Sequence, residues 1–533
     1  MGIPSYFSYI IQKYSSIIKP IHTCKINNFY LDCNSIIYDT IKNIDVSSVK
    51  ENISTIIISQ VIRKIEEYIY TIKPDNVVYI AFDGVAPLAK LEQQRQRRFK
   101  SLYQEETLNA ILKKEKSSIW NNCAITPGTT FMKQLNTTME SHFTEADKYN
   151  VNKLVLSLSN QYGEGEHKIF EYIRENPLEH NTSTTCIYGL DADLIMLCIN
   201  HLHLCKSIFL YRETPDFISN INSSLEPNTS YLFDISILGE KIVDTMKHKV
   251  ELTQSMYVYL HDYIFLCFML GNDFLPHFPS VNIRTGGIFK LLNAYKHVMG
   301  SGECLTNGTK IYWKHVRKII KHLAGLEEYH IIEELKQRDK IRIQSNNKTN
   351  TPENIIKNFE SMPLQNRILE NQLNPNVPGW KYRYYTLLFH TEPDEIRIKQ
   401  ICMNYLEGLE WTMKYYTTNC FDWKWKYKYH YPPLLSDLIK YTPYFETELI
   451  PYLNPSPVSD IVQLSYVLPK KYLSLLPKEV YEELLLNHSH LYVDNCPFVW
   501  VFCKYFWECH ADLPHININT LEQIARGRKD VND

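Results

Sequence analysis

The first 300 residues alternate short apolar runs with segments of helical periodicity. This alternation constrains the fold, because strands separated by amphipathic helices form a mostly parallel sheet with helices on its faces. We therefore predict an α/β domain whose strands lie at residues 28–31, 76–82, 153–159, 185–188 and 207–211. Helical patterns separate them, as at 53–71 and 167–175. The apolar run 262–270 fits a buried helix and a buried strand equally well.

The composition changes further along the chain. Residues 337–378 are rich in Asn, charge and proline, whereas residues 379–526 are rich in aromatic residues and mostly helical in pattern. We predict an α/β domain at 1–320, a linker or projecting insertion at 321–378, and a second, mostly helical region at 379–526. No glycine-rich nucleotide loop occurs, which argues against a nucleotide-driven motor.

The composition also limits the classes of protein. The chain is 44% hydrophobic with a net charge of -2, which predicts a buried core and argues against coating nucleic acid through overall basicity. Thirteen cysteines without a CxxC pair indicate reduced thiols in an intracellular protein rather than disulfides or structural zinc. No apolar run approaches the roughly 18 residues that span a bilayer. We expect an unanchored protein without a membrane partner.

Carboxylates follow several of the apolar runs directly. Residues after the carboxyl ends of parallel strands converge on one edge of the sheet, so we expect these side chains to meet there. Together they would repel unless a cation neutralised them, and an oxygen-only ligand set suits Mg²⁺, with Mn²⁺ as the alternative. Two such ions about 4 Å apart can activate water and stabilise the leaving oxygen of a phosphodiester. Any one of these carboxylates could instead be a turn or helix-cap residue. The set comprises Asp32, Asp83, Glu164, Glu166, Asp191, Asp193 and Asp273.

A basic segment begins a few residues after Asp83. Pro87 is well suited to open a helix, and four polar residues then fall on one of its faces. Arginine forks bind phosphate oxygens in pairs and lysine adds a point charge, so this face suits a terminal phosphate. A solvated amphipathic helix would show the same stripe. The four residues are Lys90, Gln94, Arg97 and Arg98.

Long, ordered motifs extend across the chain. In the first half they are residues 1–7 (MGIPSYF), 31–37 (LDCNSII), 83–99, 127–129 (PGT), 163–168 (GEGEHK), 188–195 (YGLDADLI) and 271–277 (GNDFLPH). In the second half they are 379–385 (GWKYRYY), 405–411 (YLEGLEW), 429–431 (YHY) and 436–438 (SDL). Over most of residues 1–526 the chain resembles the XRN-type 5′→3′ exoribonucleases.

This resemblance implies an α/β nuclease core related to flap endonucleases and PIN domains, with residues 379–526 covering its cleft. It implies that the seven carboxylates hold two Mg²⁺ ions and that Lys90, Gln94, Arg97 and Arg98 form a 5′-phosphate pocket too small for a cap or triphosphate. The implied partner is single-stranded RNA with a 5′-monophosphate, and decapping or other RNA-decay factors would be compatible protein partners. The implied location is intracellular, with cytoplasm favoured over nucleus.

Two positions depart from the family pattern. Tyr38 stands where the family usually has a base-stacking His, and a Tyr ring stacks equally well. Trp507 stands at the position of a stacking Trp, but the stretch before it is the hydrophobic run 499–505, so a core position is the alternative. The interpretation is a processive 5′→3′ exoribonuclease that releases nucleoside 5′-monophosphates in RNA decay. A structure-specific 5′-flap endonuclease and an inactive RNA-binding scaffold are the alternatives.

Overall fold

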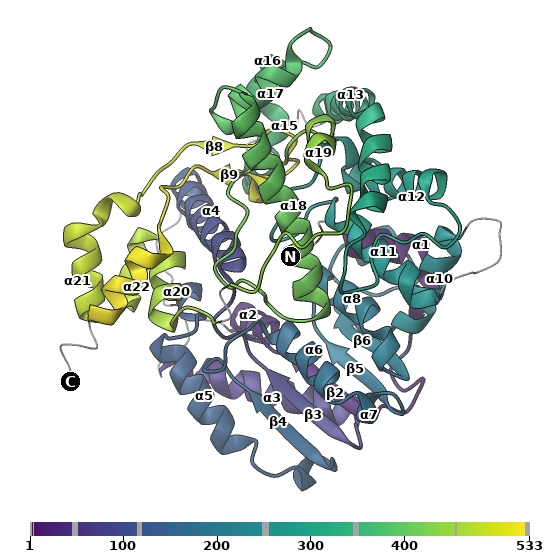
Figure 1. Cartoon of the computed structure of the whole chain (residues 1–533). Coiled ribbons are helices and arrows are strands. Elements are labelled where there is room, and N and C mark those ends of the chain that lie inside the picture. The colour runs from purple at the N-terminus through teal and green to yellow at the C-terminus, as the bar shows by residue number, and fades with distance from the viewer. Residues whose placement is uncertain are drawn as a thin grey trace.

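The computed structural model describes residues 3, 5–44, 52–113, 120–247, 255–344, 351–453 and 456–527 (Figure 1). The motif at residues 1–7 therefore lies partly outside the described residues. In Figure 1 the α/β domain occupies the lower half and the later helices lie above it. Across these ranges, no helix is long and apolar enough to cross a membrane.

The central sheet has seven strands in the order β1-β7-β6-β5-β2-β3-β4. The last five strands in this order are parallel to one another. They are β2 (Asn28–Asp32), β3 (Val77–Ala81), β4 (Lys153–Ser157), β5 (Thr184–Tyr188) and β6 (Ser207–Glu213). They confirm the five predicted strands. Two short antiparallel strands, β1 (Ile18–Lys19) and β7 (Ser230–Asp234), were not predicted. β1 has only two residues, too few to produce a periodic pattern.

Helices cover both faces of the sheet. Along β2, Phe29 and Leu31 pack into one core and Tyr30 into the other, so alternate residues are buried on opposite faces. This explains why the strands read as continuous apolar runs. One core contains α2 (Asn34–Asn43), α3 (Ile53–Ile72) and α5 (Thr130–His142). The other contains α1 (Tyr6–Lys13), α6 (Gly165–Glu175), α8 (Ala192–Asn200), α10 (Ile235–Met246) and α11 (Met256–Phe268).

Helix α11 settles the ambiguous run 262–270, most of which is helical. Asp262 is buried within it and accepts hydrogen bonds from the Tyr295 hydroxyl and from two backbone N–H groups. Asp273 therefore follows a helix rather than a strand. A buried helix that is apolar all round has the same short-range pattern as a buried strand, which is why the sequence left this run open.

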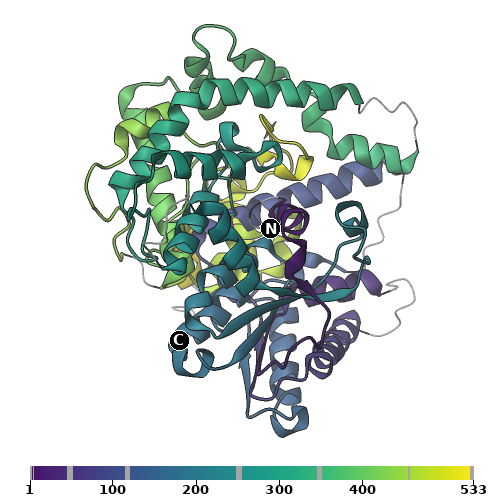
Figure 2. The ribbon, with the colours of Figure 1, turned by 90° about the vertical axis from the view of Figure 1, so that its right-hand side faces the viewer.

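Helix α4 (Leu88–Leu112) joins the two halves of the chain. Figure 2 shows it between the sheet and the long helix α13 (Trp313–Gln344). Its first turns pack through Leu88 and Leu91 against α20 (Asp460–Val467). Further along, the Gln96 amide exchanges hydrogen bonds with the backbone of Ala511.

The second half is mostly helical, as predicted. Its helices after residue 379 are α17 (Trp380–Phe389), α18 (Glu395–Thr417), α19 (Leu435–Tyr441), α20, α21 (Lys478–Asn487) and α22 (Ile518–Gly527). Strands β8 (Phe498–Val499) and β9 (His510–Ala511) form a small second sheet.

Most of the described part of region 321–378 is helical, with the end of α13 followed by α14 (Pro352–Glu360), α15 (Met362–Gln365) and α16 (Ile368–Leu373). A buried ion-pair network ties it together, since Glu370 contacts Arg338 at 2.7 Å and Arg367 at 2.5 Å. The Arg338 guanidinium also donates to the carbonyl of Cys503. These buried contacts join the described part of region 321–378 to the rest of the fold, and its division as a linker or a projecting insertion stays a prediction.

Replacing Glu370 tests whether this region belongs to the folded core. Glu370→Ala leaves the buried guanidinium groups of Arg338 and Arg367 without their shared carboxylate, so we expect the free energy of unfolding to fall by about 3 kcal/mol or more. Urea unfolding measures the change. Glu333→Ala, which breaks an exposed pair with Lys336, is the control and should leave the free energy of unfolding nearly unchanged. Equal effects would mean that the network contributes nothing to stability.

Candidate active site

A cavity of about 170 Å³ lies at the carboxyl ends of the parallel strands, and we call it the acidic cavity. It brings together most of the predicted site residues, from both the acidic set and the basic helix. They are Asp32, Tyr38, Asp83, Lys90, Gln94, Arg97, Arg98, Glu164, Glu166 and Asp191. Gln463 of α20 also lines the cavity and accepts a hydrogen bond from the backbone of Ala86, so the second region closes one side.

The ends of strands and the starts of helices position the carboxylates. Asp32 is the last residue of β2, and Asp83 follows β3 by two residues. Glu164 and Asp191 stand immediately before α6 and α8, where a cap residue would be. Neither side chain accepts a capping hydrogen bond from its helix. The helix-cap alternative therefore does not hold for these two carboxylates.

Gly165 packs directly against two of the carboxylates, Asp83 and Asp32. Its backbone N–H donates to Asp83 Oδ1 at 2.7 Å, and Asn34 Nδ2 donates to the other oxygen of Asp83 at 2.6 Å. A Cβ atom on Gly165 would lie 2.6 Å from Asp32 Oδ1, closer than real contacts allow. The glycine between Glu164 and Glu166 is therefore required by the packing of the site.

Lys90 lies among the carboxylates. Its buried Nζ is 2.6 Å from Glu164 Oε2 and 2.8 Å from Asp273 Oδ2. Burial opposes the charged ammonium, but the surrounding carboxylates, with Asp273 foremost, raise the pKa of Lys90 well above its usual value. Burial likewise acts to raise the pKa of Asp273, but Lys90 and other nearby positive charges, Arg97 among them, together outweigh it and hold that pKa below its usual range. In this structure Lys90 acts as a counter-ion to the acidic set.

Lys90 does not neutralise the whole set. Burial, together with neighbouring carboxylates, raises the pKa values of Asp32 and Glu166 well above their usual range and that of Asp193 to about 7. One buried oxygen of each of these three side chains has no hydrogen-bond partner. Buried, unpartnered carboxylate oxygens are unfavourable unless a proton or a cation is present.

These oxygens fit a hard divalent cation in their chemistry, because Mg²⁺ and Mn²⁺ prefer carboxylate ligands. Among the described residues, however, no three His, Cys, Asp or Glu side chains already form a set that could hold a metal ion. The insertion of Lys90 between Glu164 and Asp273 accounts for this, because an ammonium occupies the space between their oxygens. The metal site stays a prediction.

The basic helix presents unused donors to the same cavity. Arg98 donates through one nitrogen to Thr126 at 2.6 Å, while its buried Nη1 has no partner. Within the described part of the chain, the Arg97 guanidinium makes no hydrogen bond or ion pair. Gln94 also lines the cavity, with its acceptor oxygen Oε1 buried and without a partner. The unpaired guanidinium groups of Arg97 and Arg98 suit an anionic ligand rather than solvent.

Three predicted residues lie outside the lining of the acidic cavity. Asp193 is buried next to Asp273, whose charge helps to raise its pKa. Asp273 lines a neighbouring cavity instead, as does Trp507. The Trp507 side chain is 40% exposed, and its ring stacks with Tyr505 at 6.2 Å. The core alternative for Trp507 is therefore wrong, whereas its role in stacking stays a prediction.

The sequence did not reveal one contact between the second region and the acidic set. Tyr415 of α18 donates a hydrogen bond from its hydroxyl to Glu164 Oε1 at 2.8 Å, across 251 residues of sequence. Its ring stacks on the imidazole of His167 with 3.7 Å between centroids. A tyrosine in an aromatic-rich helix shows no pattern that separates it from the core, so only the tertiary contact identifies it.

Comparison with known proteins adds the family. Residues 1–214 match the model of the XRN 5′-3′ exonuclease N-terminus, and residues 256–375 and 372–530 match the Xrn1 helical domain. The chain belongs to the XRN family. This membership confirms the resemblance and accounts for a second, helical region attached to the α/β core.

Its relatives include 5′-3′ exoribonucleases from several organisms. The Drosophila melanogaster 5′-3′ exoribonuclease 2 homolog is 27% identical over 97% of this chain and 70% of its own length. The 5′-3′ exoribonuclease 1 of Schizosaccharomyces pombe is 27% identical over 93% of this chain and 46% of its own length. The human 5′-3′ exoribonuclease 1 is 28% identical over 93% of this chain and 32% of its own length. The chain thus spans less than half of these last two relatives.

Solved structures with some likeness include the catalytic core of Rad2 in complex with DNA substrate. It is 11% identical, covers 67% of this chain and 84% of its own, and gives a TM-score of 0.31. A score this low adds nothing to the topology described above.

Removing the counter-ion tests the electrostatics of the acidic cavity. Lys90→Met leaves Glu164 and Asp273 without their shared cation, so we expect the metal-free protein to lose about 3 kcal/mol of stability in urea unfolding with chelator. Mg²⁺ should restore more stability to this variant than to the wild type, because a bound cation replaces the lost charge. Lys470→Met, which removes an exposed pair with Asp494, is the control. If both variants are equally stable in chelator, Lys90 does not neutralise the site.

Proposed function

We propose that this protein is a magnesium-dependent, processive 5′→3′ exoribonuclease that hydrolyses single-stranded RNA with a 5′-monophosphate to nucleoside 5′-monophosphates. One observation carries the proposal: a single cavity of about 170 Å³ is lined by both the acidic set and the unpaired donors of the basic helix. A 5′-terminal phosphate held by the helix would thus lie beside the carboxylates. Membership of the XRN family supports the same activity.

The basic helix would select RNA that carries a 5′-monophosphate at its end. Arg97 and Arg98 offer guanidinium N–H groups to one terminal phosphate, and Gln94, which lines the same cavity, would donate its amide N–H₂. Small-molecule pockets commonly start at about 300 Å³, so the acidic cavity is narrow by comparison. A cap or a triphosphate adds bulk and charge that this space would exclude. Tyr38 lines the cavity and provides a ring for the first base, and the exposed ring of Trp507 is our candidate for a later base.

The acidic set is proposed to hold two Mg²⁺ ions through Asp32, Asp83, Glu164, Glu166, Asp191, Asp193 and Asp273. Such ions lower the pKa of bound water and stabilise charge on a phosphodiester. The chain itself contributes orientation, since Asn34 and Gly165 fix Asp83 and Tyr415 fixes Glu164. Gln463 and the packing of α20 on α4 close the cavity on one side.

The cellular setting is part of the proposal. RNA decay in the cytoplasm, alongside decapping or other decay factors that generate 5′-monophosphate ends, fits an enzyme that accepts only such ends.

The decisive experiment uses one unstructured, 3′-labelled RNA with a 5′-monophosphate, a 5′-triphosphate or a 5′-hydroxyl. We expect the protein with Mg²⁺ to degrade the monophosphate RNA at least tenfold faster than the others, and chelator to abolish cleavage. Gel analysis of the products measures both. Equal cleavage of all three would favour a flap endonuclease, which a 5′-flap DNA would then confirm, and no cleavage would favour the RNA-binding scaffold. Asp191→Ala should lose cleavage and still bind the RNA.

Tyr415→Phe tests the contact between the second region and the acidic set. The variant keeps the ring that stacks on His167 and loses only the hydroxyl that orients Glu164. We expect cleavage to fall by roughly tenfold or more and the Mg²⁺ requirement to rise, as when groups that orient metal ligands are removed. Tyr384→Phe, which removes a buried hydroxyl bonded to the carbonyl of Pro432, controls for stability. The same loss of activity in both variants would mean that Tyr415 acts only through folding.

A further inference from the structure

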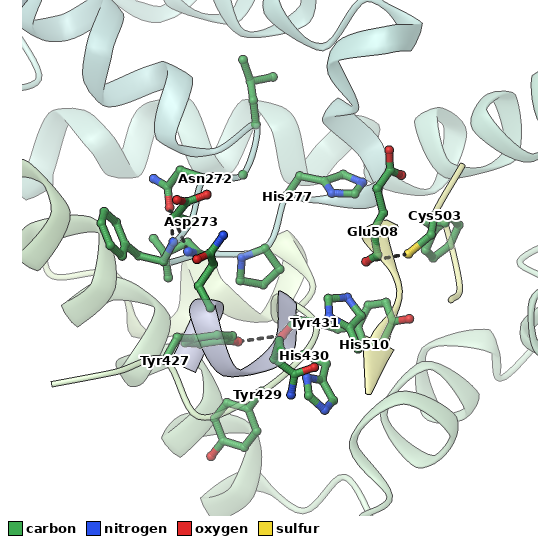
Figure 3. A pocket seen from close by; sticks show the side chains of 18 of the residues that line it. Asn272, Asp273, His277, Tyr427, Tyr429, His430, Tyr431, Cys503, Glu508 and His510 are labelled. Carbon is green, nitrogen blue, oxygen red and sulfur yellow. Dashed lines mark hydrogen bonds between the residues drawn. The ribbon is translucent and has the colours of Figure 1, made fainter. Parts of the chain in front are cut away.

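A second cavity, of about 240 Å³, lies beside the acidic cavity (Figure 3). The two share Arg97 and meet at an ion pair, because Lys90 lines the acidic cavity and its partner Asp273 lines the second one. The motif at residues 429–431 (YHY) lines this second cavity. The proposed reaction gives that motif no role, so its position here is informative.

Flat aromatic rings form one side of the second cavity. In Figure 3, Tyr427, Tyr429, His430 and His510 lie across from Asn272 and His277. The imidazoles of His430 and His510 stack with 5.0 Å between centroids and 19° between planes. Burial lowers the pKa values of both, so the rings are uncharged at neutral pH. Neutral, flat rings are the surface on which nucleobases stack.

Four cations border the rings, and three of them have partners. Lys426 pairs with Glu92 at 2.5 Å, and Arg284 pairs with Glu508 at 2.6 Å. Lys100 donates to the carbonyls of Trp507 and Cys509, at 2.6 Å each. The fourth is Arg97, which has no such partner among the residues that the structure describes. Arg97 is therefore the cation available to a ligand phosphate in the second cavity.

Buried polar atoms without partners also line the second cavity. They include both amide atoms of Gln93, Nδ2 of Asn272, Nε2 of His277 and the Tyr431 hydroxyl; Glu508 Oε1 accepts no hydrogen bond but is ion-paired with Arg284. Burial lowers the pKa of His277 to about 4, which leaves this imidazole neutral. Unsatisfied donors and acceptors are costly in an interior, so their presence together indicates a polar ligand. The edge of a nucleobase carries both kinds of group.

We propose that the second cavity binds a free nucleoside 5′-monophosphate, with its base on the His430–His510 rings and its phosphate on Arg97. The inference rests on the proposed function, because such a nucleotide is the product of that reaction. The cavity volume of about 240 Å³ is below the roughly 300–1,000 Å³ of pockets that enclose a whole drug-sized ligand, so the cavity holds no more than a single nucleotide. Arg97 lines both cavities. The phosphate of a released nucleotide would therefore stay in contact with Arg97 as the nucleotide moves from the acidic cavity to the second cavity.

Calorimetry with AMP on the Asp191→Ala protein without RNA tests the site while cleavage is blocked. We expect one AMP to bind, and 5′-monophosphorylated RNA to weaken its binding, because both phosphates use Arg97. Absence of AMP binding would overturn the proposal. Cleavage by the wild-type protein is measured separately, so active protein without an AMP site refutes only this inference, and an AMP site on inactive protein refutes only the proposed function.

His430→Leu removes half of the stacked ring pair, and we expect AMP affinity to fall about tenfold, as loss of base stacking typically does. His322→Leu removes a histidine of a similar pair, with His297, remote from the cavity and should leave AMP binding unchanged. Unaltered affinity in His430→Leu would overturn the proposal.

Gln93→Leu separates binding from folding. The Gln93 amide makes no hydrogen bond, so its loss leaves no protein group unpaired and should not lower the melting temperature. We expect AMP affinity to fall severalfold at an unchanged melting temperature. Unchanged affinity would show that these amide atoms do not meet the nucleotide.

Discussion

The buried Lys90 ammonium is the interaction on which the arrangement of the site depends. Seven carboxylates converge at one edge of the α/β core, and such a concentration of like charge is stable only with compensation. Lys90 compensates the charge of Glu164 and Asp273 through ion pairs. Asn34 and Gly165 stabilise Asp83 by donating hydrogen bonds to it. The remaining unpartnered oxygens, on Asp32, Glu166 and Asp193, show that the compensation is incomplete. These unpartnered oxygens are the observation on which the proposed cation site rests.

Helix α4 links the charges of the site to the packing of the second region. Its first turns carry Lys90 into the acidic set and pack on α20, and its Gln96 bonds the backbone beside β9. The same helix presents Arg97 to both cavities. Movement of α4 would therefore disturb the counter-ion, the phosphate donors and the contact with the second region together. This coupling gives a physical reason for the second region: it holds in place a helix whose charges would otherwise be free to rearrange.

Much of the fold followed from pattern alone. The five parallel strands were predictable because both faces of the sheet are buried, which leaves continuous apolar runs, and α4 was predictable from Pro87 and its periodic polar face. The sequence pattern was not sufficient where contacts between distant parts of the chain determine the structure. The apolar helix α11 resembled a strand, and the polar composition of 321–378 concealed the buried pairs of Glu370 with Arg338 and Arg367. Such pairs leave no periodic signal, because each charge is buried only through a partner distant in sequence.

The sequence by itself determined the chemistry of the site: which residues are acidic, which are basic, and that the strand ends and one helix face present them. Only the tertiary structure decided how these groups share space. It paired Lys90 with Glu164, exposed Trp507, brought the Tyr415 hydroxyl to Glu164, and divided the region into two cavities that share Arg97. The reason is that strand and helix periodicity specify the direction of a side chain within its own element. The partner it meets depends on how elements hundreds of residues apart pack against one another.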